Sequence, residues 1–384
     1  MSIGGSFRGV IIGLLLVAGS VYLLWTNEGR AVHVAKALEE GSGNVKSISE
    51  NKVDPANEGK LVHLSGDVKT NDTLRDDEFG VKVNALKLIR EVEFFQWKEK
   101  STGKGNSASD YSYKKEWVNA AIPSDKFKVP EDHVNKTPYP YAAYTKLAKN
   151  VSFGGFAFTE ELLGYLTTSE KLQFAEIDSN RTKNTLLNAG YFYIGSRNIL
   201  NPEIGDVRIS YKVVYPMKAS VVARQTSNTF EEYIASNDET VLLVKEGVSS
   251  ADNMFKVAVE SNKFKTWMFR WLGFFMLFFG IRAIFKPIVA LGNMIPLVGN
   301  LISMGVGIVS FALAVPVTAI VISLAWFAYR PLLSGIIIGC GLLIYFYYRN
   351  KGKKRAGAIN NLKANAGNIS ATLNSGNSKI GESK

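Results

Sequence analysis

The stretch VIIGLLLVAGSVYLLW, residues 10–25, holds no charged side chain and is too apolar to rest in water. Three more apolar stretches stand in the last third of the chain, at residues 267–285, 301–326 and 332–348. A helix of roughly 20 apolar residues matches the hydrocarbon core of a bilayer, which is about 30 Å thick. The first stretch reaches this length when it starts at Phe7 and places Arg8 near the membrane surface. The sequence therefore predicts an integral membrane α-helical protein with one N-terminal and three C-terminal spans.

The first span is expected to remain in the protein as an anchor. A secretory signal needs a small-x-small cleavage site beyond its apolar core. The segment from Trp25 to Arg30 offers no convincing site, and the small residues Ala18, Gly19 and Ser20 lie inside the apolar run. We therefore expect residues 1–30 to form an uncleaved transmembrane anchor.

A long segment of soluble composition separates the first two spans. Alternating apolar and polar side chains, typical of half-buried strands, recur along it. In residues 86–100, Leu88 and Val92 fall on one face of the expected strand, and Glu91 and Glu93 on the other. Other expected strands are at residues 60–66, 111–122, 191–195, 208–215, 220–226 and 240–245, and expected helices are at 31–40, 159–165 and 249–265. The chain is therefore divided into the anchor, a large β-rich α+β extramembrane domain at 31–262, a three-helix transmembrane region at 263–350 and a basic tail at 351–384, which we expect to be disordered.

The charge of the chain is concentrated in that tail. The formal net charge is +11, and from Arg349 onward there are eight basic residues against Glu382. Lys353, Lys354 and Arg355 directly follow the last span, where each basic side chain gains about 1 kcal/mol from anionic lipid. A nucleic-acid partner is not expected, because basic residues are not interleaved with aromatics on a folded face. The basic tail is predicted to be cytoplasmic, and the even number of spans places the β-rich domain in the periplasm or lumen.

Small residues form stripes on two of the expected spans. Gly5, Gly9 and Gly13 are spaced by four residues in the first, and Gly335 and Gly339 repeat the spacing in the last. Such stripes let helix backbones approach closely in lipid. We interpret them as candidate helix–helix contacts, with the alternative that glycine is simply common in membrane spans.

A polar motif follows the first span. It consists of Asn27, Glu28, Gly29 and Arg30, and it returns as NEGK at residues 57–60. Asn and Gly favour turns, so the motif predicts a turn at the exit of the helix, where Glu28 and Arg30 can pair at the level of the lipid headgroups. The four residues are candidate interaction residues; a plain interfacial turn is the alternative.

Motifs that bind phosphate or zinc or carry a catalytic serine do not occur in the chain. Glu91 and Glu93 share a strand face and could do acid–base chemistry, although a solvated strand face is the more ordinary explanation. His63 is interpreted as a sheet residue, and Cys340, the single cysteine, can form neither an intrachain disulfide nor a thiolate metal site. We expect no catalytic residue, cofactor or metal. Sequons for N-linked glycans begin at Asn71, Asn135, Asn150 and Asn180, among other positions, although this pattern also arises by chance.

Several segments resemble, in order, the signatures of the transmembrane protein 43 (LUMA) family. They are residues 26–31 (TNEGRA), 57–63 (NEGKLVH), 111–117 (YSYxxEW), 205–208 (GDVR), 222–225 (VARQ), 265–267 (KTW) and 326–332 (WxxYRPL). The resemblance implies one N-terminal span, a large lumenal domain, three C-terminal spans and a non-enzymatic role as a membrane organiser. Eukaryotic members of that family lie in the endoplasmic reticulum and inner nuclear membrane with lamin and emerin as partners, and bacterial relatives exist. The long basic tail departs from the animal members, so these partners are not carried over.

The sequence thus favours a non-enzymatic scaffold that self-associates into a homo-oligomer and organises membrane patches or partner proteins. A channel component is the main alternative, although the expected spans carry no acid or lysine at their centres. A membrane-tethered hydrolase would need a pocket that gathers His63, His133 or the Glu91/Glu93 pair. Expected partners are anionic lipids, at the basic tail, and other membrane proteins. The expected location is a bacterial inner membrane, or the endoplasmic reticulum and nuclear envelope in a eukaryote.

Overall fold

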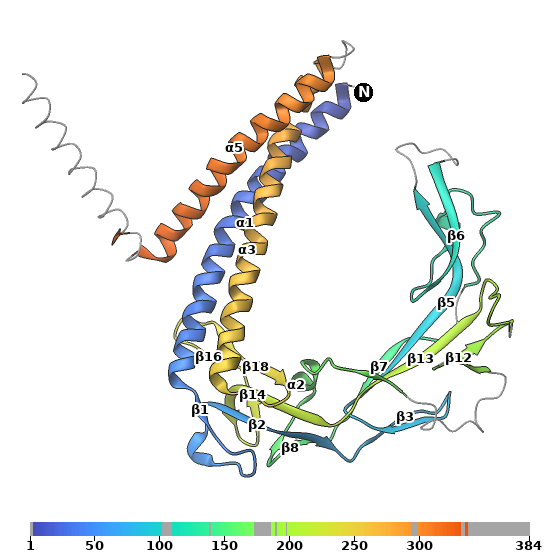
Figure 1. Cartoon of the computed structure of the whole chain (residues 1–384), viewed down its shortest axis with the longest axis vertical. Helices are drawn as coiled ribbons and strands as arrows, with labels where there is room; N and C mark the ends of the chain where they lie inside the picture. The colour runs from blue at the N-terminus through green and yellow to red at the C-terminus, as the bar shows by residue number, and fades with distance from the viewer. Residues whose placement is uncertain are drawn as a thin grey trace, which may run out of the picture. The chain divides into compact units, whose positions relative to one another are not determined.

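The computed structural model of the chain describes residues 3–101, 110–137, 140–172, 186–188, 190–196, 198–292, 298–331 and 335–336. Its contacts divide the chain into two units. Met1–His33 and Asn262–Lys384 form the first, which we call the membrane unit, and Val34–Ser261 form the second, which we call the β unit. Figure 1 shows long helices in the membrane unit and twisted sheets in the β unit.

Four helices build the described part of the membrane unit, and two of them run on into the β unit. They are α1 (Ile3–Asn44), α3 (Ala251–Ile284), α4 (Lys286–Gly292) and α5 (Val298–Tyr329). Among the described residues, α1, α3 and α5 are long and apolar enough to cross a membrane. These three helices carry the three spans expected at residues 10–25, 267–285 and 301–326. The fourth expected span, residues 332–348, lies almost wholly outside the described residues.

The turn expected after the first span is wrong. Residues 27–30 lie inside α1, which continues without a break to Asn44 and takes in the helix expected at residues 31–40. The second copy of the motif does form a turn: Asn57 ends a short 3-10 helix, η1 (Pro55–Asn57), and Gly59 has a φ of +73°. The same letters therefore adopt two conformations, because packing against α3 and α5 outweighs the local preference of the first copy.

The β unit contains two large sheets. The first has the order β15 (Thr229–Glu231), β14 (Met217–Thr226), β2 (Leu61–Thr70), β8 (Val151–Phe153), β9 (Phe156–Ala157), with β1 (Lys46–Ser47) beside β2 and β18 (Leu243–Glu246) beside β14. The second has the order β11 (Leu186–Asn188), β12 (Tyr191–Ile194), β13 (Val207–Val214), β5 (Lys87–Ser101), β6 (Tyr111–Val118), with β10 (Glu170–Lys171) beside β13 and β7 (Tyr144–Leu147) beside β5.

Smaller elements complete the unit. Two hairpins pair β3 (Thr73–Asp76) with β4 (Val81–Asn84), and β16 (Tyr233–Ile234) with β17 (Thr240–Val241). The helix expected at 159–165 is α2 (Glu160–Gly164), and the side chain of Thr159 caps it by accepting a hydrogen bond from the amide of Leu162. A 3-10 turn, η3, covers Ser124–Lys126.

One hydrophobic core joins the two large sheets. Val62 and Leu64 of β2 lie in the same buried cluster as Leu88 and Val92 of β5. The alternation expected along β5 is confirmed, because even-numbered residues from Leu88 to Gln96 are buried while the odd-numbered residues between them are only half-buried. The face of β5 that carries Glu91 and Glu93 is therefore turned away from the core.

A buried ionic centre lies within this core. Arg90 donates hydrogen bonds from Nη1 to Asp76 at 3.0 Å and to Glu78 at 2.6 Å, and Tyr211 donates its hydroxyl to Asp76 at 2.5 Å. Asp76 and Arg90 are 3% and 5% exposed. Burial by itself raises the pKa of a carboxyl, but the bonds from Tyr211 and Arg90 hold the pKa of Asp76 below its ordinary value.

Candidate functional site

Polar side chains gather where α1, α3 and α5 meet in the membrane unit, and Glu28 is the acid among them. Its carboxylate is 2% exposed. Arg270 of α3 donates from Nε to Oε1 at 2.6 Å and from Nη2 to Oε2 at 2.8 Å. Trp326 of α5 donates its indole N–H to Oε2 at 2.8 Å. One carboxylate therefore joins three helices through charge-assisted hydrogen bonds, the strong class of such bonds.

A second set of bonds involves residues on either side of Glu28 in α1 and joins this stretch to α3. Arg30 donates to the side-chain oxygens of Asn262 at 2.9 Å, Asn27 at 3.1 Å and Thr266 at 3.2 Å. The amide of Asn27 donates to the carbonyl of Thr266, and that of Asn262 donates to the carbonyl of Ala31. The expected pairing of Glu28 with Arg30 is therefore wrong, because Glu28 pairs with Arg270 and Arg30 bonds amide and hydroxyl oxygens.

We call these residues together the polar cluster: Asn27, Glu28, Arg30, Asn262, Thr266, Arg270 and Trp326. The rise along α1 from Arg8 to Asn27 is roughly 28 Å at about 1.5 Å per residue, close to the thickness of a hydrocarbon core. Trp25 lies two residues before Asn27, and Trp267 and Trp271 lie within three residues of Arg270. All three tryptophans are at least 36% exposed. Exposed tryptophans mark the interface between lipid and water. From this spacing and these tryptophans we infer that the polar cluster lies at one boundary of the membrane.

Gly29 allows α5 to approach α1 at this level. A Cβ at position 29 would lie 2.6 Å from Cζ of Tyr329, so no larger side chain fits without a shift. Tyr329 also contacts the rings of Trp25 and His33. Glycine weakens a helix by about 1 kcal/mol relative to alanine, and here it permits a contact that a Cβ would prevent.

The first glycine stripe faces the neighbouring helix of the same chain. A Cβ at Gly13 would lie 2.7 Å from the carbonyl oxygen of Gly280, and one at Gly9 would lie 2.8 Å from the side chain of Lys286. Further along, Ser20 donates its hydroxyl to the carbonyl of Gly273 at 2.7 Å. These contacts set an antiparallel register between α1 and α3.

The other expected interaction residues are distributed differently. Gly5 belongs to the first turns of α1, and a Cβ at Gly335 would have no atom of the described residues within 4 Å. Gly339, Lys353, Lys354 and Arg355 lie outside the described residues. The structure therefore brings Asn27, Glu28 and Arg30 into the polar cluster, with Gly29 beside it against Tyr329, and places Gly9 and Gly13 along the same helix.

Sequence reasoning missed the partners of the motif: Asn262, Thr266, Arg270, Trp326 and Tyr329. A signal for them existed. Glu28 is the only acid in the chain between Met1 and Val34, and Glu382 is the only one after Asn262. A lone acid at a membrane boundary requires a cation from another span, because an unpaired buried charge is costly. Arg270 lies near the start of the second expected span and is followed by eleven uncharged, mostly apolar residues. It was therefore a candidate for this cation.

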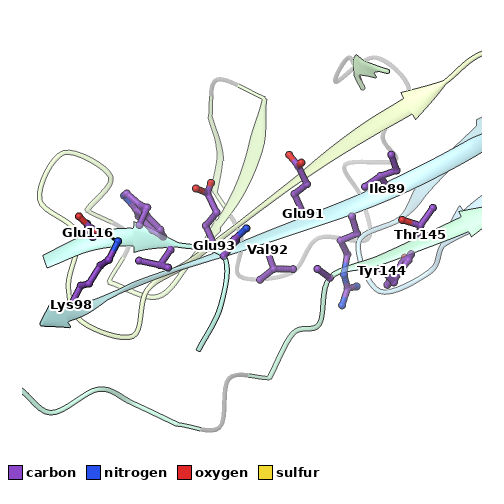
Figure 2. Close-up of a pocket in the computed structure, with 13 residues that line it drawn as sticks. Ile89, Glu91, Val92, Glu93, Lys98, Glu116, Tyr144 and Thr145 are labelled. Atoms are coloured by element: carbon purple, nitrogen blue, oxygen red, sulfur yellow. Dashed lines mark ion pairs between the residues drawn. The ribbon is translucent and has the colours of Figure 1, made fainter. Parts of the chain in front are cut away.

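The paired carboxylates of the β unit are held in ion pairs. Lys212 donates to Glu91 at 2.6 Å, and Arg208 donates two hydrogen bonds to Glu93, at 2.5 and 2.9 Å. Figure 2 shows Glu91 and Glu93 projecting to one side of β5 and Val92 to the other. Their expected position on one strand face is confirmed, and each carboxylate has its own basic partner from β13.

These residues line a groove of about 690 Å³ on the second sheet. It lies on the edge of β5 opposite β13, between two strands: β7 pairs with β5 as far as Arg90, and β6 pairs from Phe94 onward. Lys98 and Glu116, which form an ion pair at 2.6 Å, lie at one end of the groove. The groove is thus a gap in the strand ladder, lined by groups that are already paired.

The histidines named in the hydrolase hypothesis also have structural partners. His63 contacts the carbonyl oxygen of Ser249 through Nε2 at 2.8 Å and the hydroxyl of Ser47 through Nδ1 at 3.1 Å. His133 stacks on Tyr113 with the ring centroids 3.6 Å apart. Neither histidine lines the groove beside Glu91 and Glu93. Within the described residues, no group of three or more His, Cys, Asp or Glu side chains could hold a metal.

Comparison with known proteins gives a consistent result. The family model for transmembrane protein 43 matches residues 94–331. The mouse and human proteins named transmembrane protein 43 are each 30% identical to this chain, and the matches cover 88% and 87% of this chain and 88% of each relative. A fruit-fly homologue is 28% identical over 87% of this chain and 92% of its own length. No solved structure matches.

These relatives are animal proteins, so they give no support to the expected bacterial inner membrane. The matches cover α3, α5 and most of the β unit, and they agree with the signatures noted in the sequence. The chain is an integral membrane protein that belongs to the transmembrane protein 43 family.

Proposed function

We propose that this chain is a non-enzymatic membrane scaffold, which self-associates through its spans and uses the β unit to organise partner proteins or a patch of membrane. The polar cluster is the observation that carries the proposal. Glu28 accepts three hydrogen bonds from two other helices, and its charge is neutralised by Arg270. Such a cluster fixes helices relative to one another. A rigid membrane unit is what a protein needs when its role is to hold other proteins in place.

The chemistry of the β unit supports a binding role over an enzymatic one. Glu91, Glu93 and His63 are each engaged in structural bonds. An acid–base catalyst has to exchange protons with a substrate, whereas each of these two carboxylates is bonded to a basic side chain of β13. Replacing Glu91 and Glu93 together by Gln should therefore leave the scaffold's partners and oligomeric state unchanged.

Self-association is supported by the open face of α5. Gly305 and Gly307 have no atom of the described residues within 4 Å of the position where a Cβ would stand, whereas Ala314 on the same helix is fully buried. In lipid, helices associate by close packing at small residues. A second copy of the chain could approach α5 at Gly307 without displacing any described side chain of the first copy.

Cysteine crosslinking tests this contact. In a Cys340→Ser background, Gly307→Cys should give a crosslinked dimer in native membranes, because the open faces of two α5 helices meet there. Ala314→Cys is the matched control and should give none, since its side chain faces the inside of the same chain. A monomeric mass in mild detergent together with no crosslink at Gly307 would contradict self-association through α5.

The finer location and lipid partner are also part of the proposal. We place the chain in the endoplasmic reticulum or nuclear envelope, with the β unit in the lumen and the basic tail in the cytoplasm. The tail's Lys353, Lys354 and Arg355 would bind anionic lipid. Replacing these three by Gln should weaken the thermal stabilisation that phosphatidylserine gives over phosphatidylcholine. Replacing Lys363, Lys379 and Lys384, the matched control for lost charge, should weaken it less.

A channel role has less support from the described spans. The bidentate pair between Glu28 and Arg270 leaves neither charge available to attract an ion. Selective conductance in a reconstituted bilayer would favour the channel over the scaffold.

A further inference from the structure

The chain contains five Asn-x-Ser/Thr sequons, beginning at Asn71, Asn135, Asn150, Asn180 and Asn368. Their sequence alone does not distinguish them, but their surroundings do. Three fall in the described part of the β unit, and these three asparagines have very different side-chain environments. Since the sugar is carried by the amide nitrogen, an acceptor asparagine needs an accessible Nδ2 and space beyond it.

Asn135 cannot carry a sugar in the folded protein. Its side chain is 6% exposed and binds the edge of β5 as a strand would. Its Oδ1 accepts from the amide of Trp97 at 2.7 Å, and its Nδ2 donates to the carbonyls of Trp97 and Ile122 at 3.0 and 3.1 Å. Both N–H groups of the side-chain amide are therefore used, so this sequon is structural.

Asn150 is exposed, but its amide is committed to a neighbour. Its Nδ2 donates to Oδ1 of Asp72 at 3.1 Å, and its backbone N–H donates to Oδ2 of the same residue at 2.8 Å. Asp72 also accepts from the backbone of Lys149 at 2.7 Å. A sugar on Asn150 would crowd this carboxylate.

Asn71 differs from both. It is exposed in the turn between β2 and β3, and no described group bonds its side chain. The turn itself is held firmly, because Asn84 donates its amide to the carbonyls of Thr70 and Asp72 at 3.0 and 2.9 Å. Asn71 and Asn150 both line an open groove of about 460 Å³, but only Asn150 has its amide bonded to a described group there. The hydroxyl-bearing Thr73 of the Asn71 sequon is also exposed. The acceptor amide is thus presented on a rigid turn with space beside it.

We propose that Asn71 carries an N-linked glycan. In the reaction, Nδ2 of Asn71 forms a bond to the anomeric carbon of an oligosaccharide, while the bond from that carbon to the pyrophosphate of a polyprenyl carrier breaks. One Nδ2 proton is lost to a base, and the carrier pyrophosphate leaves with the bonding electron pair. The inference rests on the lumenal orientation of the β unit given under the proposed function.

The test is expression of the full chain in cultured mammalian cells, followed by peptide-N-glycosidase F. The expected result is a glycan mapped to Asn71 by mass spectrometry, one enzyme-sensitive mobility step, and loss of that step in Asn71→Gln. Thr73→Ser, which keeps the sequon, should retain the step, and Thr73→Val should abolish it. Asn150→Gln should leave the step unchanged. A glycan on Asn150 with Asn71 unmodified would overturn the assignment.

An engineered sequon distinguishes an error in the assignment of Asn71 from an error in the lumenal orientation of the β unit. Leu200 is 97% exposed, and Leu200→Thr turns residues 198–200 into a sequon at exposed Asn198. Glycan at Asn198 with none at Asn71 would overturn the site while leaving the orientation intact. Glycan at Asn368 in the tail, with none at Asn71 or Asn198, would show that the tail is lumenal and would overturn both proposals. No glycan at any of these positions would also count against both.

Discussion

Glu28 of α1 and Arg270 of α3 form a bidentate ion pair, with both charged groups shielded from solvent. They are separated by 242 positions in the sequence. Trp326 of α5 completes the arrangement by donating to the same carboxylate. The pair therefore connects the N-terminal span to the C-terminal spans, and the packing of the membrane unit depends on both of its members.

Breaking the pair should destabilise the membrane unit. Glu28→Ala leaves Arg270 buried without its counter-charge, which typically costs about 3–5 kcal/mol. The thermal unfolding midpoint of the detergent-solubilised chain should fall, and Arg270→Ala should lower it by a similar amount. A variant at the exposed Phe264 of the same helix, such as Phe264→Leu, should have little effect and serves as the control.

Replacing both charges together should restore much of the loss. Apolar residues of similar volume can substitute for a buried ion pair at little net cost, so Glu28→Leu combined with Arg270→Met should unfold at a higher temperature than either single variant. Simple additivity of the two single losses would contradict the direct coupling of the two residues.

The membrane spans and the main strands could be predicted from sequence because each depends on a local pattern. The apolar runs at residues 10–25 and 301–326 needed only length and composition. The alternation along β5 predicted which of its faces is buried, and the structure confirms that Leu88, Val92 and Phe94 lie in the core. Short edge strands such as β7 and β9 were missed, since two to four residues are too few to show a period.

The polar cluster could not be predicted in the same way. Asn27 and Gly29 favour a turn locally, so the motif was expected to end the helix. The helix continues because contacts with residues more than 240 positions away stabilise it, namely Arg270, Trp326 and Tyr329. Propensity acts over a few residues, and tertiary contacts of this strength override it.

The close approach of α3 at Gly13 yields a further prediction. Gly13→Ala places a Cβ against the backbone carbonyl of Gly280, which cannot move aside without shifting α3. Overpacking of this kind costs about 1–3 kcal/mol, and the unfolding midpoint in detergent should fall. Gly19→Ala lies on the same helix, and its Cβ would be 3.4 Å from the flexible end of Met276. This control should be neutral or stabilising, because alanine favours the helix.

The buried centre around Asp76 predicts how the β unit responds to acid. Because the pKa of Asp76 is lower in the folded than in the unfolded state, its contribution to stability is complete at neutral pH. The contribution is lost as the pH falls below about 4, the pKa of Asp76 in the unfolded chain, and on through its lower pKa in the folded chain. The urea midpoint, followed by β-sheet circular dichroism, should fall over that range. Asp76→Asn should be less stable at neutral pH, and its disadvantage should shrink in acid; a constant difference at all pH values would contradict the assignment.

Asn135 and Asn71 are a matched pair of positions in the β unit, because both begin a sequon but only Asn135 is buried. Asn135→Ala removes three hydrogen bonds and leaves the amide and carbonyl of Trp97 unpaired at the edge of β5, which costs about 1–3 kcal/mol. Asn71→Ala removes an exposed side chain and should change stability by less than about 0.5 kcal/mol. Urea unfolding of bacterially expressed chain, which carries no glycan, isolates the effect of the side chains. Equal stability of the two variants would contradict the role of Asn135 in closing the β5 edge.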